Sequence, residues 1–156
     1  MTGKISPSKS FQNFFIKLTA TFFGIGYSPW APGTMGSLAG LFLAWFIDKS
    51  SIDYLLIFLV LGFLVCKSAV DFFSSGDPSC FVMDEVCGMM ITVLFIPRTF
   101  YLYLAGFILF RIFDIAKPWP ISRIQQSKSP WAIMWDDILA GIFANLLIRG
   151  YLFYFH

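Results

Sequence analysis

Charged side chains are scarce in this chain of 156 residues. Asp, Glu, Lys and Arg together make up 13% of it and hydrophobic residues 58%, whereas soluble proteins carry about 25% charged residues. So few charges cannot cover the surface of a water-soluble globule, and the mean hydropathy of +0.75 agrees with this. The composition therefore indicates an integral membrane protein, and the length suits one domain.

Basic runs, paired cysteines and internal histidines are also missing. The net charge is only +2 and Lys and Arg form no cluster, so nucleic acid is not an expected partner. Cys66, Cys80 and Cys87 have neither disulfide-framework nor zinc-ligand spacing, and the single His156 is terminal, so we expect no disulfide and no zinc site. Cys87 is expected to be a small core residue.

Long apolar segments dominate the chain instead. They predict an all-α fold, a multi-helical integral membrane bundle with about five core helices and an N-terminal interfacial helix. Residues 24–156 would form a single helical domain. Its helices are expected at about residues 34–47, 52–73, 81–96, 99–116 and 132–153, with a polar connection over 122–130. The first of these measures only about 21 Å, less than the roughly 30 Å hydrocarbon core of a membrane.

The N-terminal segment, residues 1–23, is predicted to be amphipathic. Its apolar residues fall largely on one helical face, and polar residues interrupt the other. This pattern favours a helix lying in the membrane interface over a buried helix of a globular protein. The apolar face would consist of Phe11, Phe14, Phe15, Leu18, Phe22 and Phe23.

Alternation of the five core helices across the membrane predicts which segments lie in the cytoplasm. With residue 34 inside, seven cationic residues fall in inside segments and three in outside segments, as the positive-inside rule requires. The inside residues are Lys4, Lys9, Lys17, Lys67, Lys117, Arg123 and Lys128, and the outside residues are Lys49, Arg98 and Arg149. In this arrangement the acidic clusters of the chain all lie at the cytoplasmic end.

Five of the nine acidic residues stand in three short clusters, each attached to an apolar run. They are Asp84-Glu85, Asp114 and Asp136-Asp137. Carboxylates beside hydrocarbon lose hydration, so ionisable residues in a membrane chain mark a functional site by default. Hard oxygen ligands without histidine or thiolate favour Mg²⁺, and all five are candidate ligands of one or two ions. Because adjacent residues diverge by about 100° on a helix, we expect one member of each pair to bind directly and the other to act through water or as a base.

The same acids also have structural interpretations. The two pairs stand at helix N-termini, where carboxylates act as caps, and Asp114 has Arg111 and Lys117 three residues to either side as ion-pair partners. Beside two other acidic clusters, however, the Arg-Asp-Lys set favours a site in which Asp114 binds the ion while the two cations bind a phosphate ester.

The turn at residues 32–37, Pro-Gly-Thr-Met-Gly-Ser, offers small residues, backbone N–H groups and hydroxyls at a helix N-terminus. Thr34 and Ser37 are weaker candidates for phosphate binding there, and an ordinary turn with an N-cap is the alternative. No Cys-x5-Arg nucleophile and no internal histidine are present. Phosphate-ester hydrolysis would most simply use a metal-activated water with a carboxylate base, and an aspartyl-phosphate intermediate stays open.

Four segments resemble the phosphatidylglycerophosphatase A family, and their order and spacing fit it over roughly residues 24–149, most of the chain. The most specific is FRIFDIAKPWP at 110–120. The others are PGTMGSLA at 32–39, DP at 77–78 with DEVCGM at 84–89, and DDILAG at 136–141.

The resemblance implies a Mg²⁺-dependent, multi-pass enzyme of the bacterial cytoplasmic (inner) membrane, with its active site facing the cytoplasm. It would be a phosphoric monoester hydrolase that converts phosphatidylglycerophosphate to phosphatidylglycerol and phosphate, with this phospholipid and the bilayer as partners. Arg111 and Lys117 would hold the phosphate. The catalytic set would be Asp84, Glu85, Asp114, Lys117, Asp136 and Asp137. A small cation-coupled transporter, a phosphatase for another phospholipid phosphate and a non-catalytic membrane adaptor are the alternatives.

Overall fold

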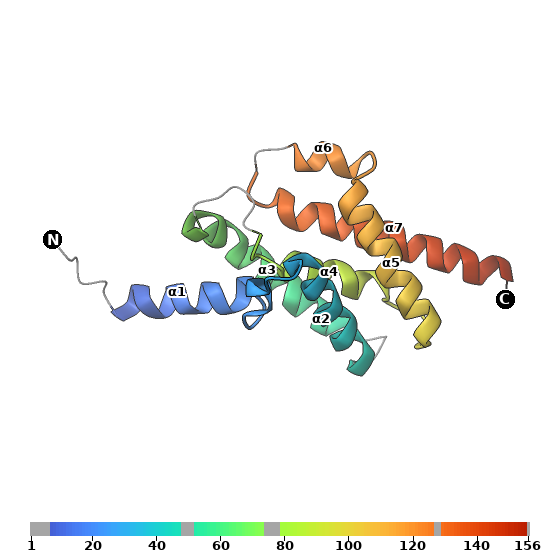
Figure 1. Ribbon diagram of the computed structural model, residues 1–156, viewed down its shortest axis with the longest axis horizontal. Coiled ribbons are helices and arrows are strands. Elements are labelled where there is room, and N and C mark those ends of the chain that lie inside the picture. Colours follow the sequence, from blue (N-terminus) through green and yellow to red (C-terminus); the bar gives the residue numbers. More distant parts are fainter. Residues whose placement is uncertain (1–6, 48–51, 74–78, 127–128, 156) are drawn as a thin grey trace.

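The computed structural model describes residues 7–47, 52–73, 79–126 and 129–155. Every regular element in these ranges is helical, which confirms the all-α prediction (Figure 1). Lys4, Lys49, Asp77, Pro78 and Lys128, and the side chain of Lys9, lie outside the described residues. The elements are α1 (Pro7–Ala20), the 3₁₀ turn η1 (Ile25–Tyr27), α2 (Pro32–Phe46), α3 (Ile52–Phe73), α4 (Met83–Thr92), α5 (Phe100–Ala116), α6 (Ile121–Gln125) and α7 (Ala132–Phe155).

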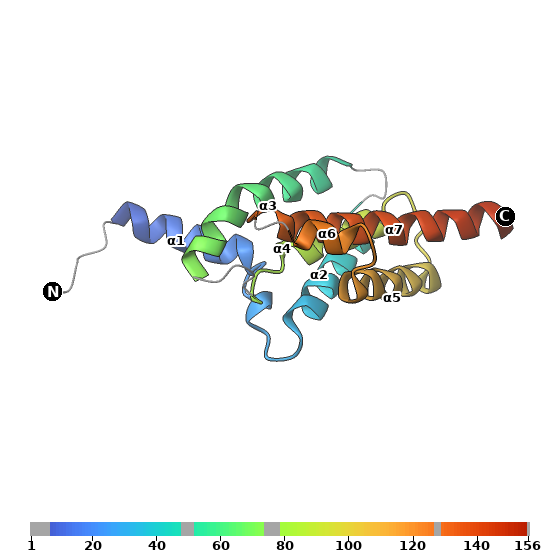
Figure 2. The ribbon, with the colours of Figure 1, turned by 90° about the horizontal axis from the view of Figure 1, so that it is seen from above.

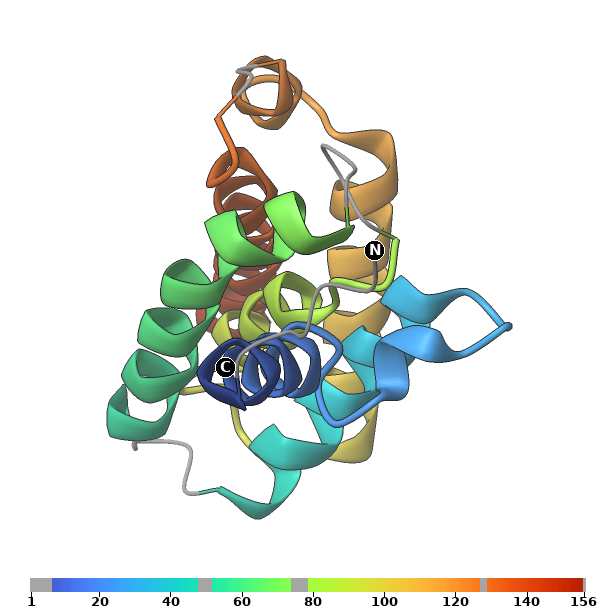
Figure 3. The same ribbon diagram turned by 90° about the vertical axis from the view of Figure 1, so that its left-hand side faces the viewer.

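Helix α4 is the centre of the bundle. It contacts α2, α3, α5 and α7, and Figure 3, which looks along the long axis, shows it enclosed among them. Val86, Cys87 and Met89 of α4 are completely buried, so Cys87 is the small core residue that the sequence predicts.

The prediction of one helix over residues 81–96 is wrong. Helix α4 has only ten residues, about 15 Å, and is too short to cross a hydrocarbon core of roughly 30 Å. The chain turns after Thr92, and Phe95 adopts a left-handed φ of 59°. The side-chain amide of Asn145 in α7 donates hydrogen bonds to the carbonyl oxygens of Ile91, Thr92 and Leu94, at 3.1, 2.9 and 2.9 Å. The side chain of Asn145 thus supplies the hydrogen bonds that a further helical turn would give to the last carbonyl groups of α4.

Helices α3 and α7 are long and apolar enough to span a membrane, and they are the two that meet this test within the described residues. Only 28% of the apolar window of each is buried, so most of it faces outward, unlike the core helix of a soluble protein. The outer faces of α2 and α5 are apolar as well, with Phe42 and Tyr101 exposed. These surfaces indicate a membrane protein, whereas the number of crossings and their direction stay predictions.

Helix α1 projects from one end of the elongated bundle and packs against α3 (Figure 2). Ile16 and Ala20 are buried in this contact, while Phe11 and Phe14 point outward with 73% and 61% of their surface exposed. The helix ends at Ala20, and Phe22 lies beyond it with a left-handed φ of 44°, buried 6.0 Å from the ring of Phe58. The single apolar face from Phe11 to Phe23 was therefore wrongly predicted at its C-terminal end, and the interfacial position of α1 stays a prediction.

A short helix also interrupts the stretch at 122–130 that the sequence predicts to be a polar connection. Helix α6 begins at Ile121, whose side chain is fully buried in a cluster with Phe110 and Ala140. This apolar residue anchors the segment after α5 against α7, so the connection is held to the bundle.

Candidate metal and phosphate site

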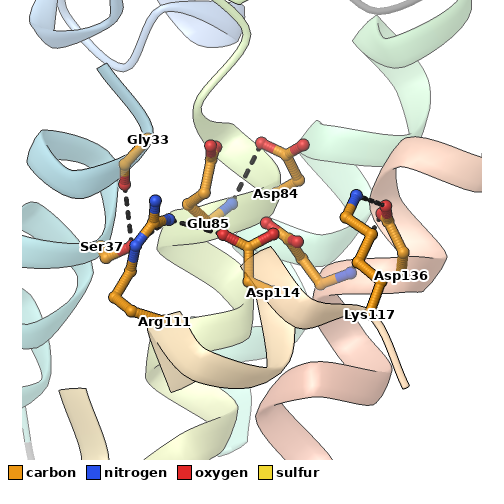
Figure 4. A network of polar contacts seen from close by, with 9 residues as sticks. Gly33, Ser37, Asp84, Glu85, Arg111, Asp114, Lys117 and Asp136 are labelled. Carbon is orange, nitrogen blue, oxygen red and sulfur yellow. Dashed lines mark hydrogen bonds and ion pairs between the residues drawn. The ribbon is translucent and has the colours of Figure 1, made fainter. Parts of the chain in front are cut away.

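The acidic clusters meet where α4 and α7 begin and α5 ends. Asp84, Glu85 and Asp137 each offer one carboxylate oxygen, and the three oxygens lie within 4.8 Å of one another. Figure 4 shows the side chains of Asp84 and Glu85 on α4 beside that of Asp114 on α5. We call Asp84, Glu85 and Asp137 the carboxylate triad.

Both members of the first acid pair contribute an oxygen to the triad, whereas which of them would bind an ion directly stays a prediction. The 100° between them on the helix does not separate them, because α4 is enclosed and the longer Glu85 side chain bends toward the same space as Asp84. Neither is an N-cap, since Val82 holds that position and makes no side-chain capping bond. Asp84 instead accepts a hydrogen bond from the backbone N–H of Glu85 at 3.0 Å.

Glycines beside the acid pairs let the helices come this close. A Cβ on Gly141, four residues after Asp137, would lie 2.3 Å from the carbonyl oxygen of Gly88 in α4. A Cβ on Gly33 at the start of α2 would lie 2.4 Å from a carboxylate oxygen of Glu85. The small residues in the sequence segments around the acids therefore have a steric purpose, which is to admit the neighbouring helix and the Glu85 side chain.

The triad carries more negative charge than its surroundings balance. Asp84 is 6% exposed, and burial, followed by the charge of Glu85, raises its pKa well above the usual range. Burial raises the pKa of Glu85 as well. The Oε2 atom of Glu85 is buried and has no hydrogen-bond partner among the described residues. A buried carboxylate oxygen without a partner costs free energy unless a cation or a proton binds it.

Asp114 lies against the triad but has a partner of its own. Its Oδ2 atom is 2.6 Å from Nη1 of Arg111, so the ion pair that the sequence offers as a structural role is present. The same Nη1 atom is 3.4 Å from the hydroxyl of Ser37, which donates to the carbonyl oxygen of Gly33 at 2.8 Å. The charge of Asp114 also acts on Glu85 and on Asp137. Arg111 thus links α2 to α5 at the edge of the triad.

Ser37 and Thr34 differ in what they contact. The hydroxyl of Ser37 is buried and engaged with Arg111, so it holds the guanidinium in position. Thr34 lies half-buried in the first turn of α2, one turn before Ser37, and its backbone N–H bonds to the carbonyl oxygen of Ala31 at 2.9 Å.

Lys117 pairs with Asp136 and not with Asp114. It ends α5 in a left-handed conformation with φ of 42°, which directs its side chain away from the helix and onto a carboxylate oxygen of Asp136 on α7. Burial lowers the pKa of Lys117, but the hydrogen bond and charge of Asp136 outweigh it, so the net pKa is raised and the ammonium stays charged. The second acid pair is therefore divided: Asp137 joins the triad and Asp136 binds Lys117.

Asn145 is the polar residue of this region that the sequence interpretation missed. It lies eight residues after Asp137 in α7, and it stands alone in an apolar run. An uncharged polar residue in such a run is a signal for a buried hydrogen bond, which here holds the far end of the helix that carries Asp84 and Glu85.

Comparison with known proteins identifies the family. The family model described as Phosphatidylglycerophosphatase A matches residues 18–152. The Escherichia coli (strain K12) protein named Phosphatidylglycerophosphatase A is 36% identical to this chain over 134 residues (80% of this chain, 76% of that protein). The Haemophilus influenzae protein of the same name is 37% identical over 140 residues (85% of this chain, 86% of that protein). A Bacteroides thetaiotaomicron protein named "Putative phosphatidylinositol-3-phosphatase" is 35% identical over 152 residues (87% and 92%). No solved structure matches the chain significantly. The family model covers most of the chain, including every residue of the triad, and the chain therefore belongs to the phosphatidylglycerophosphatase A family of phosphoric monoester hydrolases.

Proposed function

We propose that this protein is a Mg²⁺-dependent lipid phosphatase that hydrolyses phosphatidylglycerophosphate to phosphatidylglycerol and phosphate, a step of phospholipid biosynthesis. It would act from the cytoplasmic face of the bacterial inner membrane. The observation that carries the proposal is the convergence of three carboxylate oxygens within 4.8 Å, with Arg111 and Lys117 beside them. The names of the Escherichia coli and Haemophilus influenzae relatives support the choice of substrate.

The triad suits a Mg²⁺ ion. Mg²⁺ prefers oxygen ligands at about 2.0–2.1 Å, so oxygens bound to one ion lie no more than about 4.2 Å apart, which small side-chain rotations of the triad would reach. No described residue bonds to the Oε2 atom of Glu85, so an ion would displace none of them from it. Asp84, Glu85 and Asp137 would hold the ion, and Asp114 and Asp136 are further ligands for it or for a second one. When bound, Mg²⁺ would supply the positive charge that stabilises the phosphoryl oxygens during the reaction.

Charge balance argues for the metal independently. Within the described part of the chain, five carboxylates face two cations, Arg111 and Lys117, so a phosphate dianion would be repelled from the metal-free site. With the carboxylates engaged by the ion, the two cations become available to the phosphate. Arg111, held by Ser37, would bind phosphate oxygens at one side and Lys117 at the other, with Thr34 as a weaker ligand.

Hydrolysis then needs one proton to move. The oxygen of a water molecule attacks phosphorus, and the bond between phosphorus and the ester oxygen of the glycerol breaks. A carboxylate of the site accepts the proton of the water, and the same proton neutralises the departing glycerol alkoxide. The products are inorganic phosphate and phosphatidylglycerol.

The test is phosphate release by the purified protein in mixed micelles of phosphatidylglycerophosphate, with Mg²⁺ and with EDTA. We expect release only with Mg²⁺, and a loss of at least about 100-fold in kcat for Asp114→Asn, Asp84→Asn and Asp137→Asn. Asp53→Asn is the control, because Asp53 is an exposed acid in the first turn of α3. Full activity in EDTA, or full activity of Asp114→Asn, would contradict the proposal. A parallel series with phosphatidylinositol 3-phosphate tests the other substrate class, and a higher kcat/KM for it would replace the proposed substrate.

A further inference from the structure

An apolar groove runs between α2 and α5 on the outside of the bundle. It has a volume of about 490 Å³ and an almost entirely apolar lining. Its walls carry large side chains that are open to the exterior, Phe42 being 65% and Leu104 42% exposed. The residues that line this α2–α5 groove include Leu38, Leu41, Phe42, Phe46, Phe100 and Leu104.

The groove starts at the candidate phosphate site. Three contacts fix the two helices as antiparallel neighbours: Ser37 with Arg111 at 3.4 Å, Trp45 with Tyr103 at 5.2 Å between ring centroids, and the Tyr103 hydroxyl, which donates to the carbonyl oxygen of Ala44 at 3.4 Å. Figures 1 and 3 show α2 and α5 side by side. Leu38 follows Ser37 directly in α2, so the groove begins one residue along the helix from the side chain that contacts the guanidinium of Arg111.

From that end the groove leads away from every acidic cluster. The distance along α2 from Leu38 to Phe46 is about 12 Å at the rise of an α-helix. A phospholipid has the same order of parts, with a phosphate at the polar end and an acyl chain extending from it into the hydrocarbon. Arg111 supplies the charge complementary to the phosphate, and the groove supplies apolar surface at the next position along the helices.

We infer that the α2–α5 groove binds one acyl chain of the lipid whose phosphate occupies the site at Arg111. This inference rests on the proposed function. The groove would recognise the acyl chain of the substrate lipid, whereas bulk lipids would cover the outer faces of α3 and α7. A second groove of about 400 Å³ lies between α5 and α7. Its lining, from Tyr101 to Tyr151, includes no residue of α2, so it provides a matched control.

Photolabelling tests the location directly. The probe is phosphatidylglycerophosphate with a diazirine in one acyl chain, activated by ultraviolet light before the lipid is hydrolysed. The control is phosphatidylcholine with the same modified acyl chain. We expect the phosphate probe to label peptides of α2 and α5 several-fold more than the control lipid does, and both lipids to label α3 equally. Equal labelling of α2 and α5 by both lipids would identify the groove as ordinary lipid-facing surface and overturn the inference.

Kinetics with the long-chain substrate tests the function of the groove. Leu104→Trp narrows the α2–α5 groove, and we expect KM to rise about tenfold with kcat nearly unchanged, the change produced by the loss of one or two buried methylene contacts. Leu147→Trp makes the same substitution in the α5–α7 groove and should leave both constants unchanged. An equal rise for both variants, or none for Leu104→Trp, would overturn the inference. If wild type releases no phosphate, the proposed function fails instead, and the photolabelling still decides the groove.

Discussion

The carbonyl oxygen of Gly88 lies 2.3 Å from the position that a Cβ on Gly141 would occupy. No side chain fits at this crossing, so the backbones of α4 and α7 are in direct contact one turn away from Glu85 and from Asp137. The contact sets the distance between two helices that together supply the whole carboxylate triad. Two glycines, which carry no functional side chain, thereby control the geometry of the site.

Gly141→Ala should therefore impair stability and activity together. Because the obstructing atoms belong to the Gly88 backbone, relief requires the helices to separate, and we expect a loss of about 1–3 kcal/mol in the free energy of unfolding. A displacement of the Asp137 carboxylate by about 1 Å should lower kcat about 100-fold. Thermal unfolding in detergent and phosphate release measure the two effects. Gly150→Ala is the control on the same helix, since nothing lies within 4 Å of its Cβ position. Wild-type stability and activity of Gly141→Ala would show that the contact between Gly88 and Gly141 does not control the geometry of the site.

Features determined by local sequence were predictable. Helix α3 has the predicted bounds, Ile52–Phe73, because its apolar run and its flanking polar residues are local signals. The meeting of the acid clusters at one end also follows from the chain, since helices that alternate in direction bring the start of α4, the end of α5 and the start of α7 together.

Features determined by contacts between distant residues were not predictable. Helix α4 stops at Thr92 because Asn145, more than fifty residues later, binds its last carbonyl groups. Lys117 pairs with Asp136 because a left-handed residue ends α5, and no sequence pattern announces a positive φ at a lysine. For the same reason the division of Asp136 from Asp137 required the structure.

The Lys117–Asp136 pair allows a double-mutant test that separates structural from catalytic roles. Lys117→Met removes the ion-pair partner of the buried Asp136 carboxylate, so we expect a loss of about 3–5 kcal/mol in stability. The double variant Lys117→Met/Asp136→Asn should recover most of that stability, since neither charge remains. Activity should stay low in both variants, because the proposed phosphate ligand Lys117 is absent from each. Recovery of activity in the double variant would mean that the pair is purely structural.

Asn145→Ala tests the long-range cap of α4. The substitution removes the amide donor from the carbonyl groups of Thr92 and Leu94, of which Leu94 keeps a longer bond from Arg149 at 3.4 Å. We expect a loss of about 1–3 kcal/mol in the free energy of unfolding. Leu146→Ala, at the next and exposed position of α7, controls for general truncation of this helix. KM for the lipid should hardly change, because the cap lies at the end of α4 opposite to Glu85. Equal melting temperatures for the two variants would contradict the cap.

Glu85→Gln should raise the stability of the protein in EDTA and greatly reduce its activity with Mg²⁺. In EDTA the wild-type Glu85 carboxylate is buried and one of its oxygens has no partner, so replacing it with a neutral amide of similar shape should raise the melting temperature. With Mg²⁺ at 100 times its dissociation constant, binding should stabilise wild type by about 2.7 kcal/mol, and the variant should gain much less because a ligand is missing. We expect its kcat to fall at least about 100-fold. Unfolding curves with and without Mg²⁺ measure the binding effect without any substrate, with Asp53→Asn as the control that behaves like wild type. A Mg²⁺-induced shift of equal size in Glu85→Gln would remove Glu85 from the metal site, whatever the activity of the variant.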